Sequence, residues 1–402
     1  MFKLINNSIC APKGFLATGV HAGIRKNSQK LDLAVIYCQQ PAVAAGVFTT
    51  NQVRAAPVLL TEQHIKEGML QAIVVNSGNA NACTGPLGMQ HAIEMAETTA
   101  AKLQLPINRV AVASTGVIGV TLPIEKITQG IKAAIPKMAS SGNEAAEAIM
   151  TTDTYSKKVA IEMQCGNKTI RIGGIAKGSG MIHPNMATML AFITTDVAIS
   201  QAALQQALSL ITQASFNMIT VDGDSSTNDM ALILASGMAQ NKPIDSIDDP
   251  NWQIFCAGLS FVCTFLAKEI AQDGEGATKL IEVQVKGAET EEHARLAARA
   301  VCRSPLVKTA TFGRDANWGR IACALGASGA TLDPNQLNIK LGHLALLKDG
   351  TPLLFDEIIA EKLLAEKNVV FKVNLGVGNA EATAWGCDLS HEYITINASY
   401  RS

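Results

Sequence analysis

The chain has 402 residues, which suits two or three domains or one large α/β unit with a smaller lobe. Lys and Arg number 33 against 34 Asp and Glu, so no large positive field is present to attract nucleic acid or an anionic membrane. Aromatic residues make up only 4%, which argues against a stacking platform for single-stranded nucleic acid, whereas 48% apolar residues exclude a disordered chain.

Helical and strand patterns alternate along the chain. Four stretches carry apolar residues at helical spacing: 89–103, 124–135, 204–211 and 255–270. Five short runs rich in strand-forming residues predict β-strands: 72–75, 110–113, 281–285, 369–373 and 393–396. Strands mixed with helices predict an α/β fold, with a mixed α+β arrangement as the alternative. The glycine-rich break at 273–276 predicts the start of a C-terminal lobe over 278–402.

The cysteines and the apolar runs indicate the compartment. The nine cysteines are scattered and odd in number, and none has CxxC or zinc-type spacing, which favours free thiols in a reducing environment. The first residues lack the apolar core of a signal peptide. Lys268 and Glu269 close the longest apolar run, 254–267, so we expect no membrane span and a cytoplasmic protein.

Common enzyme motifs are absent from the sequence: it contains no GxGxxG, Walker A, HExxH or GxSxG pattern. The segment at 222–226 begins like a calcium loop. Thr227 stands where the loop needs glycine, however, and Ile233 stands where it needs glutamate. We therefore expect a hydrogen-bonded acidic turn there and no metal site.

Five segments rich in small, hydroxyl and amide residues adjoin the apolar runs: 76–85, 114–119, 177–190, 222–229 and 273–278. Loops at strand ends commonly carry the ligand site of an α/β protein, and small residues let backbone N–H groups approach a ligand closely. Together these segments predict a binding site for a small molecule.

The segment at 177–190 has the most distinctive composition. Gly178 and Gly180 permit unusual backbone angles, Pro184 restricts the chain, and Thr188 precedes the apolar run 189–193. A strained bend beside a hydroxyl is what intramolecular attack on a peptide bond requires. These residues alone leave two interpretations open, a nucleophilic Thr188 or an ordinary loop before a buried strand.

The same segment, KGSGMIHPNMATML, resembles the self-cleavage motif of the ornithine acetyltransferases, also called arginine-biosynthesis bifunctional glutamate N-acetyltransferases. Further segments match that family in order and extend the resemblance over nearly the whole chain: FTTN at 48–51, the segment 76–85, STG at 114–116, the segment 222–229, GRDANWGR at 313–320 and NASYRS at 397–402.

The resemblance implies self-cleavage between Ala187 and Thr188, giving an α chain of residues 1–187 and a β chain of residues 188–402. It implies a layered fold of sheets and helices typical of acyltransferases with a self-cleaved threonine nucleophile. Thr188 would be the nucleophile, and Thr115 with Gly116 would form the oxyanion hole. From the residues alone, Thr115 and Gly116 can also be a simple turn at a strand end.

The resemblance also implies six substrate-binding positions: Thr151, Lys177, Thr188, Glu275, Asn397 and Ser402. A lysine that faces a carboxylate and a glutamate that faces an ammonium suit an N-acetyl amino acid. The family often ends in threonine, and the terminal serine here keeps the hydroxyl. Read without the family, the two charged residues can be solvated loop charges, Thr151 a hydroxyl at a helix end, and the last two positions a frayed tail.

The implied activity is a ping-pong transfer of acetyl from N2-acetyl-L-ornithine to L-glutamate, the recycling step of arginine biosynthesis. Some family members also use acetyl-CoA and glutamate. The resemblance implies neither a metal nor an organic cofactor, and an assembly of two α and two β chains. Two other classes stay open: a hydrolase that releases free acetate, and a binding protein that performs no turnover.

Overall fold

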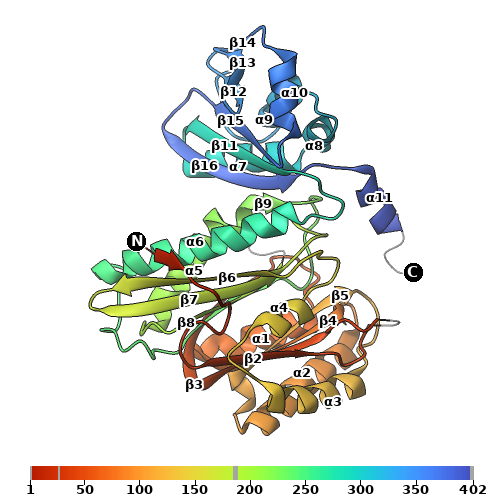
Figure 1. Ribbon diagram of the computed structural model, residues 1–402, viewed down its shortest axis with the longest axis vertical. Coiled ribbons are helices and arrows are strands. Elements are labelled where there is room, and N and C mark those ends of the chain that lie inside the picture. The colour runs from red at the N-terminus through yellow and green to blue at the C-terminus, as the bar shows by residue number, and fades with distance from the viewer. Residues whose placement is uncertain (1, 26–27, 184–188, 399–402) are drawn as a thin grey trace. The chain divides into compact units, whose positions relative to one another are not determined.

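The computed structural model describes residues 2–25, 28–183 and 189–398. These residues form two compact units. The first unit comprises residues 2–178, 189–217 and 225–266, and the second comprises Ser179–His183, Met218–Asp224 and 267–398 (Figure 1). The boundary before the C-terminal part falls inside a helix, between Leu266 and Ala267, and so a few residues before the glycine-rich break.

The first unit is built on one sheet to which nine of the described strands belong, in the order β1-β6-β7-β8-β10-β3-β4-β5 with β2 also paired to β3. The strands are β1 (Phe2–Leu4), β2 (Phe15–Val20), β3 (Leu33–Phe48), β4 (Met69–Asn79), β5 (Val110–Val117), β6 (Lys157–Cys165), β7 (Lys168–Lys177), β8 (Leu190–Thr195) and β10 (Met230–Ala235). Strands β8 and β10 are parallel, as are β4 and β5.

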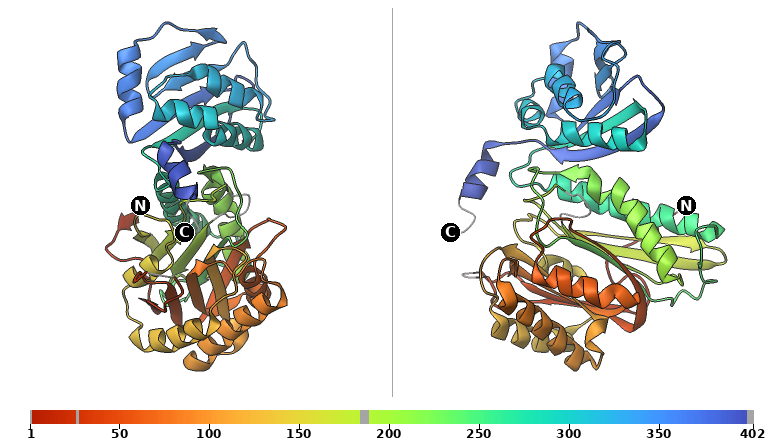
Figure 2. Two further views of the ribbon diagram at one scale, coloured as in Figure 1. Left: turned by 90° about the vertical axis from the view of Figure 1, so that its right-hand side faces the viewer. Right: turned by 180° about the vertical axis from the view of Figure 1, so that it is seen from behind.

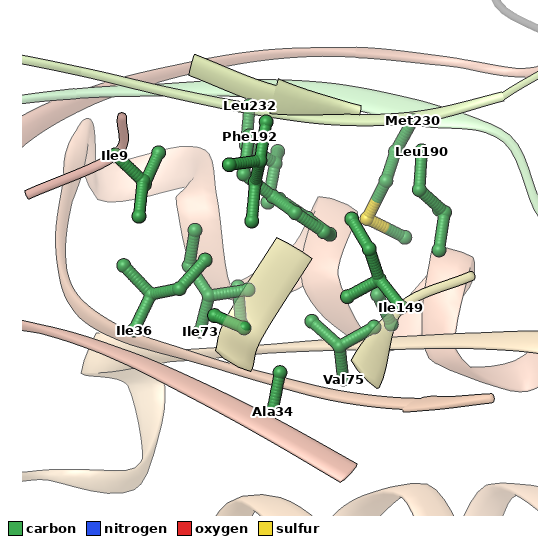
Figure 3. Packing of buried hydrophobic residues seen from close by; sticks show 14 of the residues in the cluster. Ile9, Ala34, Ile36, Ile73, Val75, Ile149, Leu190, Phe192, Met230 and Leu232 are labelled. Atoms are coloured by element: carbon green, nitrogen blue, oxygen red, sulfur yellow. The ribbon is translucent and has the colours of Figure 1, made fainter. Parts of the chain in front are cut away.

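Strand β3 turns this sheet into two facing layers. Its first half pairs with β2 and β4, and its second half pairs with β10, with a register shift between Tyr37 and Ala42. A bulge of this kind bends a strand and increases its twist. The two layers then pack face to face, and Figure 3 shows Phe192 and Leu232 pointing toward Ile36 and Ile73 across the shared core.

Helices cover the outer faces of both layers in the first unit (Figures 1 and 2). Helices α2 (Gly85–Leu103) and α3 (Ile124–Ala134) bury Met95 and Ile127 against the valines of β3, β4 and β5. Helix α6 (Pro250–Gln272) lies on the other layer, where Leu266 contacts Gly174 of β7. The remaining helices of this unit are α1 (Ala56–His64), α4 (Asn143–Ala148) and α5 (Gln201–Ala214).

The second unit has a smaller sheet, to which seven of the described strands belong, in the order β14-β13-β12-β15-β11-β16-β9. Its strands are β9 (Ile219–Thr220), β11 (Leu280–Ala288), β12 (Asn338–Leu341), β13 (Leu344–Lys348), β14 (Thr351–Pro352), β15 (Asn368–Asn374) and β16 (Ala380–Cys387). Its helices are α7 (Glu291–Arg303), α8 (Pro305–Phe312), α9 (Trp318–Gly326), α10 (Glu357–Ala365) and α11 (His391–Ala398). Helix α7 packs on β11 and β16.

Layered sheets with helices and a smaller C-terminal lobe confirm the predicted α/β class. All four helical stretches are helices, and four of the five predicted strands are strands. The strand predicted at 393–396 is wrong, because these residues lie in helix α11. None of the residues of α11 is buried and Ile394 is 66% exposed, so the apolar alternation there does not mark a sheet face.

Helix α6 is longer than its apolar run suggested, because it continues through Lys268 and Glu269 to Gln272. By length and composition it is the one helix among the described residues that could cross a membrane. Half of the apolar 18-residue window of this helix is buried inside the protein.

Candidate active site

The predicted oxyanion residues, Thr115 and Gly116, lie at the end of β5, where it pairs with the end of the parallel strand β4. Thr115 pairs with Ser77 and Gly116 pairs with Gly78, and the register then shifts at Asn79. The sequence predicted that these strands would end at 75 and 113, but they continue to Asn79 and Val117. The expected loop residues are therefore irregular strand ends, and such irregularities often re-aim groups beside a functional site.

Only glycine fits at position 116. Its φ is +132°, and a Cβ there would lie 2.3 Å from the carbonyl carbon of Gly78 and 2.5 Å from the backbone nitrogen of Asn79. The two strand ends touch along their backbones at this point. Gly116 therefore supplies an N–H group that the neighbouring strand holds in place, which suits an oxyanion donor.

Lys177 is the residue that connects this pair to strand β8. It is the last residue of β7, lies opposite Leu190 in the antiparallel ladder, and is 7% exposed. Its Nζ donates to Thr115 Oγ1 over 3.4 Å. This arrangement leaves the hydroxyl proton of Thr115 to be donated to a substrate oxygen, and the ammonium charge favours negative charge developing there.

The buried carboxylate of Asp153 accepts hydrogen bonds from three other residues of the first unit. It accepts hydrogen bonds from Thr151 N at 2.8 Å, from Gly178 N at 2.7 Å and from Lys157 Nζ at 2.7 Å. Burial alone would raise the pKa of Asp153, but the charges of Lys177 and Lys157 and these hydrogen bonds hold it well below its usual range. The Asp153 carboxylate thus interacts with two of the predicted substrate residues, with Thr151 by a hydrogen bond and with Lys177 through its charge.

A second buried carboxyl group, that of Asp229, has a pKa shifted in the opposite direction. Asp229 precedes β10, and burial raises its pKa well above the ordinary value despite hydrogen bonds from Ser226 and the charge of Lys177. Its Oδ2 has no hydrogen-bond partner within the part of the chain that the structure describes. The ammonium group of Lys177 therefore lies beside Thr115, while burial disfavours the ionised form of Asp229.

In the second unit, Glu275 and Asn397 lie together. Asn397 Nδ2 donates to Glu275 Oε2 over 2.8 Å, and Glu275 N donates to Ser179 O over 3.0 Å. A Cβ on Gly180 would lie 2.4 Å from the Glu275 carboxylate, so the glycine makes room for it. Two of the predicted substrate residues, Glu275 and Asn397, are therefore in contact, and a carboxylate placed there can accept hydrogen bonds from an ammonium group.

The acidic turn at 222–224 has its carboxylate already occupied. Asp222 accepts from Met181 N at 2.6 Å and from Ile182 N at 2.9 Å. These bonds agree with the expected acidic turn. Among residues 2–25, 28–183 and 189–398, no three His, Cys, Asp or Glu side chains converge as a metal site would require.

Three of the predicted residues, Ala187, Thr188 and Ser402, lie outside the described residues. The sequence had given no role to Asp153 or Lys157, because their importance comes from contacts and not from a motif. The FTTN segment is predicted only as a family match, whereas the segment 222–229 is also predicted as an acidic turn and as part of a small-molecule site. In the structure, Thr49 and Asn51 donate hydrogen bonds to the middle of the segment 222–229, at Ser226 O and Ser225 O.

A backbone N–H and a hydroxyl presented beside a buried ammonium can stabilise a negatively charged oxygen, as enzymes of acyl transfer do. Comparison with known proteins agrees with this class. A model of the ArgJ family matches residues 16–402, and the chain belongs to that family. The arginine biosynthesis bifunctional protein ArgJ of Symbiobacterium thermophilum is 54% identical over 396 residues, covering 98% of both chains.

Two solved structures are also similar. The crystal structure of arginine biosynthesis bifunctional protein argJ from Bacillus halodurans is 48% identical with a TM-score of 0.50, covering 52% of this chain and 97% of that chain. The structure of ornithine acetyltransferase complexed with ornithine from Mycobacterium tuberculosis is 45% identical with a TM-score of 0.44, covering 46% of this chain and 100% of that one.

Proposed function

We propose that this protein transfers the acetyl group of N2-acetyl-L-ornithine to L-glutamate in arginine biosynthesis, through an acetyl ester on Thr188. One observation carries the proposal. Lys177 pairs with Leu190, two residues after Thr188, and also contacts Thr115 Oγ1 at 3.4 Å. The oxyanion pair is therefore one side chain away from the start of the strand that follows the nucleophile.

The precursor first cleaves itself. The Thr188 hydroxyl attacks the carbonyl carbon of Ala187, the acyl group moves from nitrogen to oxygen, and water hydrolyses the ester. The products are an α chain ending at Ala187 and a β chain whose Thr188 has a free amino group. The Bacillus halodurans structure supports this step, because a match to 52% of this chain covers 97% of that one, as expected for a single cleaved chain.

The freed amine then serves acetyl transfer. An α-amino group has an ordinary pKa of about 7.7–8.0, so near neutral pH a useful fraction is unprotonated and can accept the hydroxyl proton. Thr188 Oγ attacks the acetyl carbon, the oxyanion is held by the Thr115 hydroxyl and the Gly116 N–H, and the proton passes to the departing ornithine nitrogen. The amine of glutamate attacks the acetyl ester in turn and regenerates the hydroxyl.

We infer the substrate contacts from the charges of the predicted binding residues. We assign Lys177 to the substrate carboxylate and Glu275 to its ammonium group, with Thr151, Asn397 and Ser402 as further polar contacts. Since the Symbiobacterium relative is called bifunctional, we extend the proposal to acetyl-CoA as a second acetyl donor for glutamate. Release of free thiol from acetyl-CoA in the presence of glutamate tests this extension.

Intact-mass spectrometry tests the central step. The wild-type protein should yield two fragments divided between Ala187 and Thr188, and Thr188→Ala should remain whole. Acetyl-labelled ornithine should then label the β chain alone, and glutamate should remove the label as N-acetylglutamate. Intact wild-type protein, or release of the label as free acetate with glutamate present, would contradict the proposal.

The wider properties are proposed on the same basis. We propose an assembly of two α and two β chains, which light scattering of the cleaved protein measures. We propose no metal or organic cofactor, so dialysis against a chelator should leave the transfer rate unchanged. A cytoplasmic location is supported by the nine free thiols, which suit a reducing compartment.

A further inference from the structure

The side chain of Asn228 makes three hydrogen bonds in the first unit, and two of them are to backbone carbonyl groups near Thr115 and Gly116. Its side chain is buried, with the residue 4% exposed, and it precedes β10 by two positions. Its Nδ2 donates to Ala80 O at 2.5 Å and to Ser114 O at 2.9 Å. Its Oδ1 accepts from Thr227 Oγ1 at 2.6 Å, which orients the amide.

The two carbonyl groups that Asn228 holds lie on either side of the oxyanion pair. Ser114 O belongs to the peptide group whose nitrogen is that of Thr115. Ala80 follows the neighbouring strand and its N–H donates to Val117 O at 2.9 Å. One amide group therefore fixes the chain just before Thr115 and, through Ala80, just after Gly116.

The segment that carries Asn228 is itself anchored to the end of β3. Thr49 Oγ1 donates to Ser226 O at 2.9 Å, and Thr49 N donates to Asp229 O at 3.0 Å. Ala55 N donates to Thr227 O at 2.9 Å. These bonds give the amide a rigid support, which a positioning group needs in order to hold its target in place.

We propose that Asn228 is a positioning residue for the oxyanion hole of this enzyme. It acts through the Ser114–Thr115 peptide and the Ala80–Val117 bond, keeping the Thr115 hydroxyl and Gly116 N–H aimed at one point. The inference rests on the proposed acyl transfer. It assigns a role to the segment at 222–229 and to the FTTN segment, which supports it.

The loss of a positioning residue and the loss of a packing residue differ in their effects on kcat and KM. Donors of an oxyanion hole act on the transition state more than on the bound substrate, so a displaced donor lowers kcat and leaves KM nearly unchanged. A misplacement of about 1 Å can cost about 100-fold in rate. We expect Asn228→Ala to lower kcat by about 10- to 100-fold with KM within about threefold of wild type.

Asn241 provides a matched control in the same unit. It is also buried, at 6% exposed, and follows β10 where Asn228 precedes it. Its Oδ1 accepts from Ala198 N at 2.8 Å, and its Nδ2 donates to Ala198 O at 3.1 Å and Lys242 O at 2.8 Å. Asn241→Ala therefore loses a comparable set of bonds at the other end of the strand.

The experiment compares wild type, Asn228→Ala and Asn241→Ala by urea unfolding, by the rate of self-cleavage and by steady-state acetyl transfer. We expect similar losses of stability in both variants, with slower cleavage and lower kcat in Asn228→Ala alone. Equal kinetic effects in the two variants would overturn the inference. A wild-type protein without acetyl transfer would instead refute the proposed function itself, and the inference with it.

Thr227→Val keeps the test decisive if Asn228→Ala fails to fold. Valine has nearly the shape of threonine but cannot donate to Asn228 Oδ1, so the amide loses its orienting bond and keeps its bulk. We expect kcat to fall about 3- to 10-fold with KM unchanged, in proportion to the loss of one hydrogen bond. Wild-type kcat in a folded Thr227→Val protein would contradict the positioning role.

Discussion

The substitution Gly116→Ala tests the oxyanion hole most directly. A Cβ at this position would lie 2.3 Å from the Gly78 carbonyl carbon, so the two strand ends must separate. Real Cβ atoms essentially never lie within 3.0 Å of another heavy atom and seldom within 3.4 Å, so a shift of about 1 Å is needed. The φ of +132° adds a conformational cost for any residue with a side chain.

A displacement of this size removes one donor from the oxyanion position. Losing such a donor costs about 2.7–4 kcal/mol of transition-state stabilisation, which corresponds to a fall of about 100- to 1,000-fold in kcat. We expect the same fall in the rate of self-cleavage, because both reactions pass through a tetrahedral oxyanion. Time-resolved intact-mass spectrometry measures cleavage, and acetyl transfer from acetyl-ornithine to glutamate measures kcat.

Gly119→Ala is the matched control, because Gly119 also has a positive φ, +79°, but no atom lies within 4 Å of its added Cβ. Both variants carry a strained alanine near the same strand end, and only one forces the strands apart. If Gly116→Ala cleaves and transfers acetyl within about threefold of Gly119→Ala, the assignment of the oxyanion hole is wrong.

Three further outcomes are expected. Asp153→Asn leaves the buried ammonium of Lys157 without its carboxylate and should lower the unfolding free energy by about 3–5 kcal/mol in urea titration. The folded-state pKa of Asp153 is lowered, so its carboxylate stabilises the folded protein above about pH 4. This contribution to the free energy of unfolding is lost as the pH falls below that value, and the Asp153→Asn variant should lack this pH dependence. Burial, with the charges of Arg299 and Arg303, lowers the pKa of His183 to about 4, so NMR should show its ring titrating near that value. The free energy of unfolding should therefore decline as the pH falls from about 6.5 toward 4, because the unfolded chain binds the proton first. Glu275→Gln should raise the KM for amino-acid substrates about 10- to 100-fold without lowering the melting temperature, and an unchanged KM would contradict its role in binding the ammonium group.

The buried charges indicate why the site is assembled from several strands. An isolated lysine inside a protein is costly, and Asp153 offsets that cost for Lys157 while also fixing two backbone N–H groups. Burial raises the pKa of Asp229 well above its ordinary value, which disfavours a second negative charge in this region. Lys177 thus holds an ammonium group at Thr115 without any substrate present, which is the kind of preorganised charge that can stabilise an oxyanion.

Local patterns in the sequence determined much of the secondary structure. The helix over Gly85–Leu103 and the strand over Leu280–Ala288 follow from apolar spacing of 3.6 and 2 residues, which depends only on neighbours along the chain. The same reasoning failed at 393–396, because four alternating residues are too few to distinguish a strand from a short exposed helix. The family resemblance, carried by residue order, identified the candidate nucleophile and its partners.

Tertiary structure alone decided how these residues act together. Lys177 and Thr115 are 62 positions apart, and Asn228 reaches across 114 positions to Ser114 and 148 to Ala80. No periodicity encodes such contacts, because they depend on the bend in β3 that sets the strand order around β8 and β10. Through its family resemblance the sequence predicted a nucleophilic threonine and an oxyanion pair, and the folding of one sheet onto itself placed the Lys177 ammonium and the Asn228 amide beside Thr115.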